Sequence, residues 1–206
     1  MFKLIIGNRN YSSWSLRPWL AAKQAGLPFE EIPIASLQSA DRVKFLKHSP
    51  SGKIPCLIDG DTVVWESMSI CEYLAEKAPM LWPSKMSARA EARSIACEMH
   101  SGFTALRQRM SFDVRASLPF QRPSLEVEAD VARIVSIWES CRQRYGNEGP
   151  FLYGRFTNAD ATYAPVVFRF LTYHVDLPEK SRQWVETMAA LPAMQEWRQA
   201  AIGEAS

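Results

Sequence analysis

The chain has 206 residues, of which 47% are hydrophobic and 22% charged, and its formal net charge is +2. This composition is typical of a globular protein and excludes a disordered or collagen-like chain. Because no block of like charges and no apolar stretch of membrane-spanning length occurs, we expect neither a nucleic-acid nor a membrane partner, and we predict a cytoplasmic protein.

Strands and helices alternate in the first 78 residues. In chain order, the pattern predicts a strand at 2–6, a helix at 15–25, a strand at 28–35, a short amphipathic segment at 41–48, strands at 56–58 and 62–66, and a helix at 67–77. Pro18 falls in the first turn of the first helix, and Asp59-Gly60-Asp61 is a hairpin signal. The order βαβαββα is that of a thioredoxin-like domain.

The rest of the chain is predicted to be helical. Residues 79–87 contain two prolines and no periodicity, as a linker does. Helical segments follow at 88–115, 124–145, 158–173, 180–190 and 192–201, with no convincing strand. Such a change marks a domain boundary. We therefore expect an α/β thioredoxin-like domain at 1–78, a linker at 79–87 and an all-α domain at 88–206.

Cysteines and histidines give no sign of a metal centre. The four cysteines are far apart, form no CxxC pair and lie in apolar patterns, so we interpret Cys56, Cys71, Cys97 and Cys141 as reduced core residues. The three histidines are equally scattered. We therefore expect no metal cofactor.

The stretch Ser49-Pro-Ser-Gly-Lys-Ile-Pro55 carries the first chemical signal. Pro55 opens a strand after a loop and is a candidate for a cis peptide bond, which would turn the main chain of Ile54 outward. That main chain could then pair with an extended peptide, as in strand addition. The alternative is an ordinary proline of an edge strand.

Glu66 and Ser67 stand where the fourth strand becomes a helix. The helix N-terminus and the Ser67 hydroxyl favour a carboxylate, and Glu66 can hold an ammonium group beside it. Together they would bind a free amino-acid end. The alternative is that Ser67 only caps the helix.

A serine cluster, Asn10-Tyr-Ser-Ser-Trp-Ser-Leu-Arg17, leads from the first strand into the first helix. In a thioredoxin-like domain this loop faces the loop before the cis proline, so Ser12 or Ser13 would meet the thiol of a bound peptide and stabilise its thiolate. The alternative is that these serines are turn and cap residues. Arg17 is either an electrostatic supporter or the partner of a structural salt bridge.

These motifs resemble those of the cytosolic glutathione S-transferase superfamily, and we expect a bacterial member. SSWSLR is similar to the serine motif SSCSxR of the zeta class, with Trp14 in place of the cysteine. Further along the chain, Thr157 to Asp160 followed by Pro165 resembles the family's [ST]xxD capping motif.

The resemblance implies a glutathione site with assigned roles. Lys53 would approach the glycyl carboxylate, Ile54 before cis Pro55 would pair with the cysteinyl main chain, and Glu66 and Ser67 would hold the γ-glutamyl end. It also implies a homodimer that uses glutathione as a co-substrate with a small electrophile.

A second-substrate pocket is expected beside the glutathione site. Met99, Phe103 and Arg107 recur at helical spacing, and Tyr11 and Trp14 lie in the aromatic loop. Such stripes also occur in hydrophobic cores. Zeta-class isomerases carry an arginine for their acidic substrate at a position that aligns here with Thr172, and Arg169 lies one turn earlier on the same face. The resemblance therefore does not extend to maleylacetoacetate isomerase activity.

Three functions remain to be compared. The leading one is a transferase in which serine-stabilised glutathione attacks an electrophilic carbon or a peroxide, in conjugation, isomerisation or peroxide reduction. A thiol reductase is disfavoured because no cysteine precedes Cys56. The third is a non-catalytic binding protein that keeps the fold.

Overall fold

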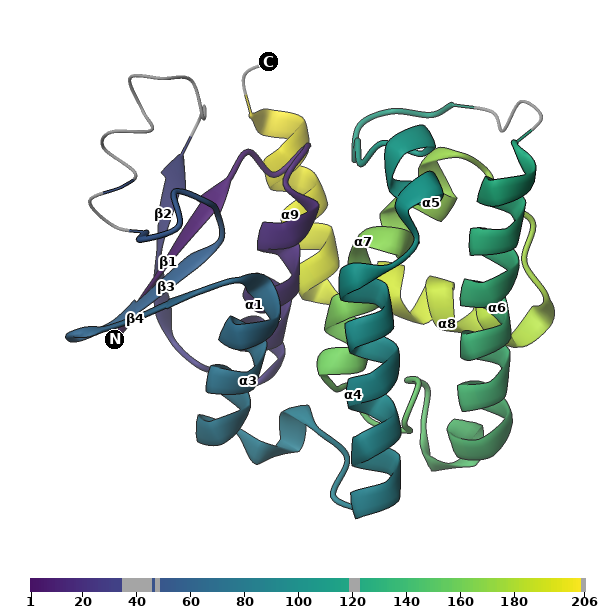
Figure 1. Cartoon of the computed structure of the whole chain (residues 1–206), viewed down its shortest axis with the longest axis horizontal. Coiled ribbons are helices and arrows are strands. Elements are labelled where there is room, and N and C mark those ends of the chain that lie inside the picture. Colours follow the sequence, from purple (N-terminus) through teal and green to yellow (C-terminus); the bar gives the residue numbers. More distant parts are fainter. Residues whose placement is uncertain (35–45, 47–48, 119–122, 205–206) are drawn as a thin grey trace.

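The computed structural model describes residues 1–34, 46, 49–118 and 123–204. Figure 1 shows a sheet on one side, helices packed on the face that looks toward the middle of the molecule, and further helices beyond them. Apart from Leu46, the amphipathic segment predicted at 41–48 lies outside the described residues.

A four-stranded mixed sheet forms the N-terminal part. Its strands are β1 (Phe2–Gly7), β2 (Phe29–Ile34), β3 (Cys56–Asp59) and β4 (Thr62–Trp65). They lie in the order β2-β1-β3-β4, with β1 and β2 parallel and the other two pairs antiparallel. The predicted thioredoxin-like α/β arrangement is therefore confirmed.

The predicted hairpin joins β3 to β4. Asp59 pairs with Thr62, which leaves Gly60-Asp61 as a two-residue loop. Gly60 has φ +59°, a conformation open to glycine without steric cost. The turn is therefore one residue later than Asp59-Gly60.

Two helices cover the inner face of the sheet (Figure 1): α1 (Ser13–Gln24) and α3 (Ser67–Lys77). Because α1 begins two residues earlier than predicted, Pro18 lies in its second turn and not its first. Proline has no N–H to donate there, so the carbonyl of Trp14 lacks its usual helical partner.

The remaining helices form the second part of the molecule. They are η1 (Pro79–Leu81, 3₁₀), α4 (Met86–Ser101), α5 (Thr104–Arg109), α6 (Leu125–Tyr145), η2 (Gly146–Glu148, 3₁₀), α7 (Asn158–Thr172), α8 (Glu179–Ala190) and α9 (Pro192–Gly203). Among the described helices, none is both long and apolar enough to cross a bilayer.

The helix predicted at 88–115 is wrong in its second half. It breaks after Ser101, where Phe103 adopts a left-handed conformation with φ 56°. A Cβ atom at Gly102 would lie 2.8 Å from the carbonyl oxygen of Glu98, so the close turn requires glycine. Only the short helix α5 follows.

Helix α7 is buried along nearly its whole length, packs against α1 and α4, and begins with the predicted capping box. Asp160 Oδ2 accepts hydrogen bonds from the Thr157 N–H (2.9 Å) and hydroxyl (3.1 Å). Its other oxygen accepts from Leu152 N–H (3.0 Å) and Trp184 Nε1 (2.9 Å). One carboxylate thus joins three segments of the helical part.

One hydrophobic core runs from the inner face of the sheet through α1 and α7 into the helical part. Cys71 and Cys141 belong to it, and Cys56 is buried in a smaller cluster on the outer face of the sheet. Cys97 is exposed on α4, so its assignment to the core is wrong. Cys97 lies in a stretch of small and polar residues, and this pattern did not distinguish a buried cysteine from an exposed one.

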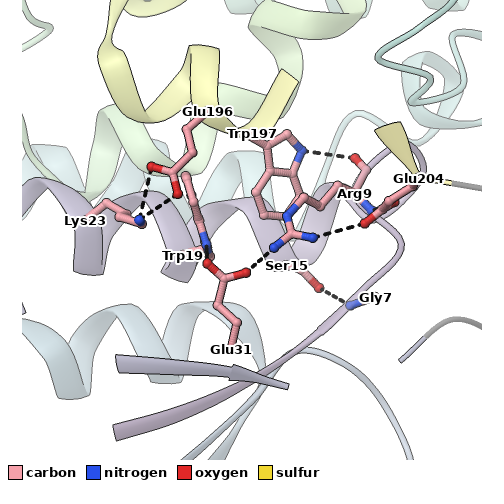
Figure 2. Close-up of polar contacts among 9 residues, drawn as sticks. All are labelled: Gly7, Arg9, Ser15, Trp19, Lys23, Glu31, Glu196, Trp197 and Glu204. Carbon is pink, nitrogen blue, oxygen red and sulfur yellow. Dashed lines mark hydrogen bonds and ion pairs between the residues drawn. The ribbon is translucent and has the colours of Figure 1, made fainter. Parts of the chain in front are cut away.

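Helix α9 returns to the N-terminal part, where it contacts α1 and the loop that follows β1 (Figure 2). Trp197 Nε1 donates to the carbonyl of Arg9 (3.0 Å), and the N–H of Arg9 donates to Glu204 (2.6 Å). Lys23 of α1 pairs with Glu196 (2.7 Å). The end of α9 therefore anchors the loop that carries the serine cluster.

Candidate functional site: a pocket between the cis proline and helix α3

A cavity of about 310 Å³ lies between the loop before β3 and the junction of β4 with α3. Its lining residues are Trp14, Ser51, Lys53, Ile54, Pro55, Trp65, Glu66 and Ser67. All five residues predicted to bind glutathione are among them. The structure therefore brings the two predicted halves of the site together around one space.

The Ile54–Pro55 peptide bond is cis, as the sequence predicts. Gly7, at the end of β1, lies against this loop. A Cβ atom at Gly7 would be 2.4 Å from Ile54 Cδ1 and 3.1 Å from Ser12 Oγ. A larger residue at position 7 would push against the end of the Ile54 side chain and against Ser12, so glycine favours this close packing. No pattern in the sequence indicated it.

Helix α3 begins at the pocket without a side-chain cap. Ser67 is 1% exposed, and its hydroxyl has no hydrogen-bond partner in the part of the chain that the structure describes. A buried polar group without a partner costs about 1–3 kcal/mol. The amides of the first helical turn also lack partners within the helix. This corner is suited to binding an anion.

Glu66, just before α3, is held in a conformation that is rare for a side-chain-bearing residue. Its φ is 77°, and its side chain is half exposed at the rim of the pocket. Strained main chain of this kind is characteristic of functional sites. The carboxylate can receive a cation beside the anion-binding corner.

The serine cluster forms a short hydrogen-bond chain. Ser15 Oγ accepts from the N–H of Gly7 (3.1 Å) and lies 2.7 Å from Ser12 Oγ (Figure 2 shows the first contact). Ser15 is fully buried. When Ser15 donates its proton to Ser12, the Ser12 hydroxyl is free to donate to a third group. Ser13 starts α1 and has no comparable place in this chain.

Arg17 is buried below the pocket and does not line it. It forms no ion pair with any carboxylate that the structure describes, so the structural salt bridge finds no support in this part of the chain. Instead its guanidinium lies 4.4 Å from the centre of the Trp14 ring and 3.5 Å from His100 Nδ1. Burial lowers the pKa of Arg17 to about 9, and the nearby Arg107 adds to this effect. Arg17 therefore places a buried positive charge against Trp14, which lines the pocket.

The predicted second-substrate residues separate into two groups. Trp14 lines the pocket, and Tyr11 is 57% exposed, with Arg115 over its ring. Met99 and Phe103 are only 2% and 7% exposed and belong to the core, so the structure gives them no substrate-facing surface.

Arg107 is used structurally. Its Nη2 donates to the carbonyls of Met99 (2.9 Å) and His100 (2.8 Å) at the C-terminus of α4, where a cation is favourable. Its guanidinium also lies 5.0 Å from the Trp14 ring centre. Its assignment to a substrate pocket is replaced by that of a helix-capping residue.

Two family domains match most of the chain. Residues 11–77 match the glutathione S-transferase N-terminal domain, and residues 98–200 match the glutathione S-transferase C-terminal domain. The chain belongs to the glutathione S-transferase family. Among the described residues, no group of three His, Cys, Asp or Glu side chains could hold a metal ion.

Relatives of several classes align with this glutathione S-transferase. A zeta-class glutathione S-transferase of Euphorbia esula is 39% identical over 69 residues, which are 33% of this chain and 31% of the relative. Glutathione S-transferase F10 of Arabidopsis thaliana is 28% identical over 162 residues, or 73% and 74% of the two chains. A probable maleylacetoacetate isomerase of Caenorhabditis elegans is 31% identical over 48% of this chain and 46% of its own. The chain thus spans about a third of the first of these relatives and about half of the isomerase.

Solved structures agree on the fold. A glutathione transferase homologue from Burkholderia GL BGR1, solved with bound glutathione, superposes with a TM-score of 0.74 at 22% identity, covering 98% of this chain and 99% of the other. Glutathione transferase F2 of Populus trichocarpa gives 0.73 at 21% identity, covering 99% and 100%. The predicted transferase fold is confirmed, whereas a bacterial source and the zeta-like class stay predictions.

Proposed function

We propose that this protein is a glutathione transferase that binds glutathione in the 310 Å³ pocket and activates its thiol through Ser12. In the proposed complex the cysteinyl main chain pairs with Ile54, and Lys53 approaches the glycyl carboxylate. The γ-glutamyl carboxylate lies at Ser67, and the ammonium group lies at Glu66. The observation that supports this assignment most directly is the unpartnered hydroxyl of Ser67, a residue that lines the same cavity as the cis-proline loop.

Serine activation is energetically sufficient. Lowering the pKa of a thiol from about 8.5 by about two units takes about 2.7 kcal/mol. A hydrogen bond to a charged group contributes about 1.5–3 kcal/mol, and a helix N-terminus about 0.3–1 kcal/mol. Ser12 stands at the N-terminus of α1 and can supply both, so no general base is required.

The hydrogen-bond chain from Gly7 through Ser15 favours Ser12 over Ser13 as the donor. Because Gly7 N–H occupies an acceptor position of Ser15, the Ser15 proton can point to Ser12, and that polarises the Ser12 hydroxyl toward a thiolate. Ser13 has no such support. Arg17 acts from behind the wall as an electrostatic supporter.

The reaction is proposed to be attack of the thiolate on a small electrophile, in conjugation, isomerisation or peroxide reduction. Isomerisation of an acidic substrate would need an exposed arginine to bind the substrate's carboxylate, and α7 has none. Arg169 is 6% exposed and donates to the carbonyl of Met110, and Thr172 donates to the carbonyl of Asp113 (2.9 Å). Conjugation is therefore the reaction that we test.

We also propose two domains at 1–78 and 88–206, joined by the linker 79–87, in a cytoplasmic homodimer. The last N-terminal helix ends at Lys77 and α4 begins at Met86, which is compatible with these boundaries.

The test compares Ser12→Ala with Ser13→Ala. For wild-type protein saturated with glutathione, the ultraviolet absorbance of the bound thiolate is titrated against pH, and conjugation to chlorodinitrobenzene is measured. We expect Ser12→Ala to raise the pKa of the bound thiol by about one to two units, with little change in the Kd of glutathione. Ser13→Ala is the control and should behave as wild type. If both variants keep full activity, serine activation is wrong, and a wild type that binds glutathione without conjugating it would be a binding protein.

A further inference from the structure

His100 of α4 contacts the two charged residues behind and beside the pocket. Its Nε2 lies 3.1 Å from Glu66 Oε2, and its Nδ1 lies 3.5 Å from Arg17 Nη1. The Trp14 ring packs against the imidazole in a T-shaped arrangement with a centroid distance of 5.2 Å, and Arg17 covers the Trp14 ring. The imidazole therefore has a polar contact at each nitrogen and an aromatic contact with Trp14.

Hydrogen-bond chemistry decides which nitrogen of His100 carries the proton. The guanidinium of Arg17 can only donate, so Nδ1 must be the acceptor. A neutral imidazole then has its proton on Nε2, which donates to the carboxylate of Glu66. Burial lowers the pKa of His100, Arg17 and Arg107 lower it further, and Glu66 opposes them. The hydrogen bonds therefore run from the Arg17 cation through a neutral His100 to the Glu66 anion.

The Glu66 side chain needs a contact with another residue of the protein to keep one orientation. Its side chain is half exposed, and its only ion pair or hydrogen bond among the described residues is the contact with His100. A carboxylate free to rotate in water gains little from pairing with a cation, about 0–1 kcal/mol. A carboxylate held in the bound orientation loses less conformational entropy on binding.

We propose that His100 is a positioning residue that holds the Glu66 carboxylate toward the pocket, where it receives the ammonium group of the γ-glutamyl end of glutathione. This inference rests on the proposed function of the pocket. The buried charge of Arg17 acts through the same imidazole, since it fixes the Nε2–H tautomer that Glu66 requires. His100 itself does not line the cavity and does not touch the ligand.

The experiment measures how strongly the protein prefers an ammonium-bearing ligand. Calorimetry gives the Kd of glutathione and of its desamino analogue, glutaryl-cysteinyl-glycine, for wild type and for His100→Phe, His100→Gln and Glu66→Gln. Phenylalanine keeps the aromatic contact with Trp14 and removes both ring nitrogens. Glutamine keeps a donor that can reach Glu66.

We expect His100→Phe to weaken glutathione binding about five- to tenfold while leaving the desamino analogue within about twofold of wild type. His100→Gln should restore most of the preference for glutathione. Glu66→Gln should abolish that preference, and adding His100→Phe to it should cause no further loss.

Other outcomes would overturn the inference. If His100→Phe weakens both ligands equally, His100 has a general structural role, and if it weakens neither, it does not position Glu66. Should that variant fail to fold, the same decision follows from His100→Gln and Glu66→Gln, since loss of preference in the glutamine variant of His100 contradicts a donor role. A wild type that binds neither ligand rejects the proposed glutathione site itself.

Discussion

The N-termini of α3 and α7 both contain a buried polar side chain, but the two side chains differ in their hydrogen bonding and therefore in their use. Each carries a buried polar side chain in its first turn, Ser67 in α3 and Asp160 in α7. At α7 the capping box is complete, and Asp160 accepts from four donors. At α3 there is no side-chain cap, and the Ser67 hydroxyl is unpartnered within the described residues. A satisfied buried group serves folding, whereas an unsatisfied one beside a cavity is available to a ligand.

Asp160→Ala should produce the largest effect on stability. It leaves four buried donors without an acceptor, namely the N–H of Leu152, the N–H and hydroxyl of Thr157, and Nε1 of Trp184, so we expect a loss of about 3–5 kcal/mol in the free energy of unfolding. Urea unfolding followed by circular dichroism measures it. Thr157→Ala, which removes only the cap hydroxyl, should cost about 1 kcal/mol. Equal losses in the two variants would contradict the central role of the carboxylate.

Ser67→Ala should show the opposite behaviour. It removes a hydroxyl that the protein itself does not satisfy, so the free energy of unfolding should change by no more than about 0.5 kcal/mol. The Kd of glutathione should rise about ten- to a hundredfold, because a hydrogen bond to the γ-glutamyl carboxylate is lost. Calorimetry and thermal unfolding measure the two quantities.

Ser69→Ala is the matched control for this prediction, because Ser69 lies on the exposed side of the same helical turn. It should change neither quantity. A Ser67→Ala protein that is clearly less stable and binds glutathione normally would make this corner structural, like that of α7.

The sequence was sufficient to predict the position of site residues that are consecutive in the chain and lie at the end of a helix or strand. Lys53-Ile54-Pro55 and Glu66-Ser67 each place their groups through local main-chain geometry, so the motif and the position of the strand predict where they point. The capping box of α7 is local in the same sense.

Contacts between distant segments could not be predicted in this way. His100 is a lone histidine on a helix, and nothing in its neighbourhood in the sequence indicates Glu66 or Arg17. Helical spacing likewise gave the same pattern for the core residues Met99 and Phe103 as for a pocket wall. The helix breaks at Gly102, and this break changes the direction in which the residues after it point. The break depends on a close main-chain contact with Glu98, which hydrophobic periodicity cannot predict.

The smallest predicted effect concerns the pH dependence of the α3 corner. The pKa of His100 is lowered by burial and by Arg17 and Arg107, against the opposing carboxylate of Glu66. Since the ordinary pKa of histidine is about 6.5, the unfolded chain takes up this proton first as the pH falls. The part of the stability that depends on neutral His100 is present above about pH 6.5 and is lost progressively below it.

Urea unfolding of wild type and His100→Gln at a series of pH values isolates this contribution, because glutamine does not titrate. We expect the stability difference between wild type and variant to shift against wild type on acidification, by a modest amount since the imidazole remains partly exposed. No comparable shift is expected from Thr157→Ala, whose capping hydroxyl does not titrate in this range. A difference that shifts in favour of wild type at low pH would mean that folded His100 is a cation paired with Glu66.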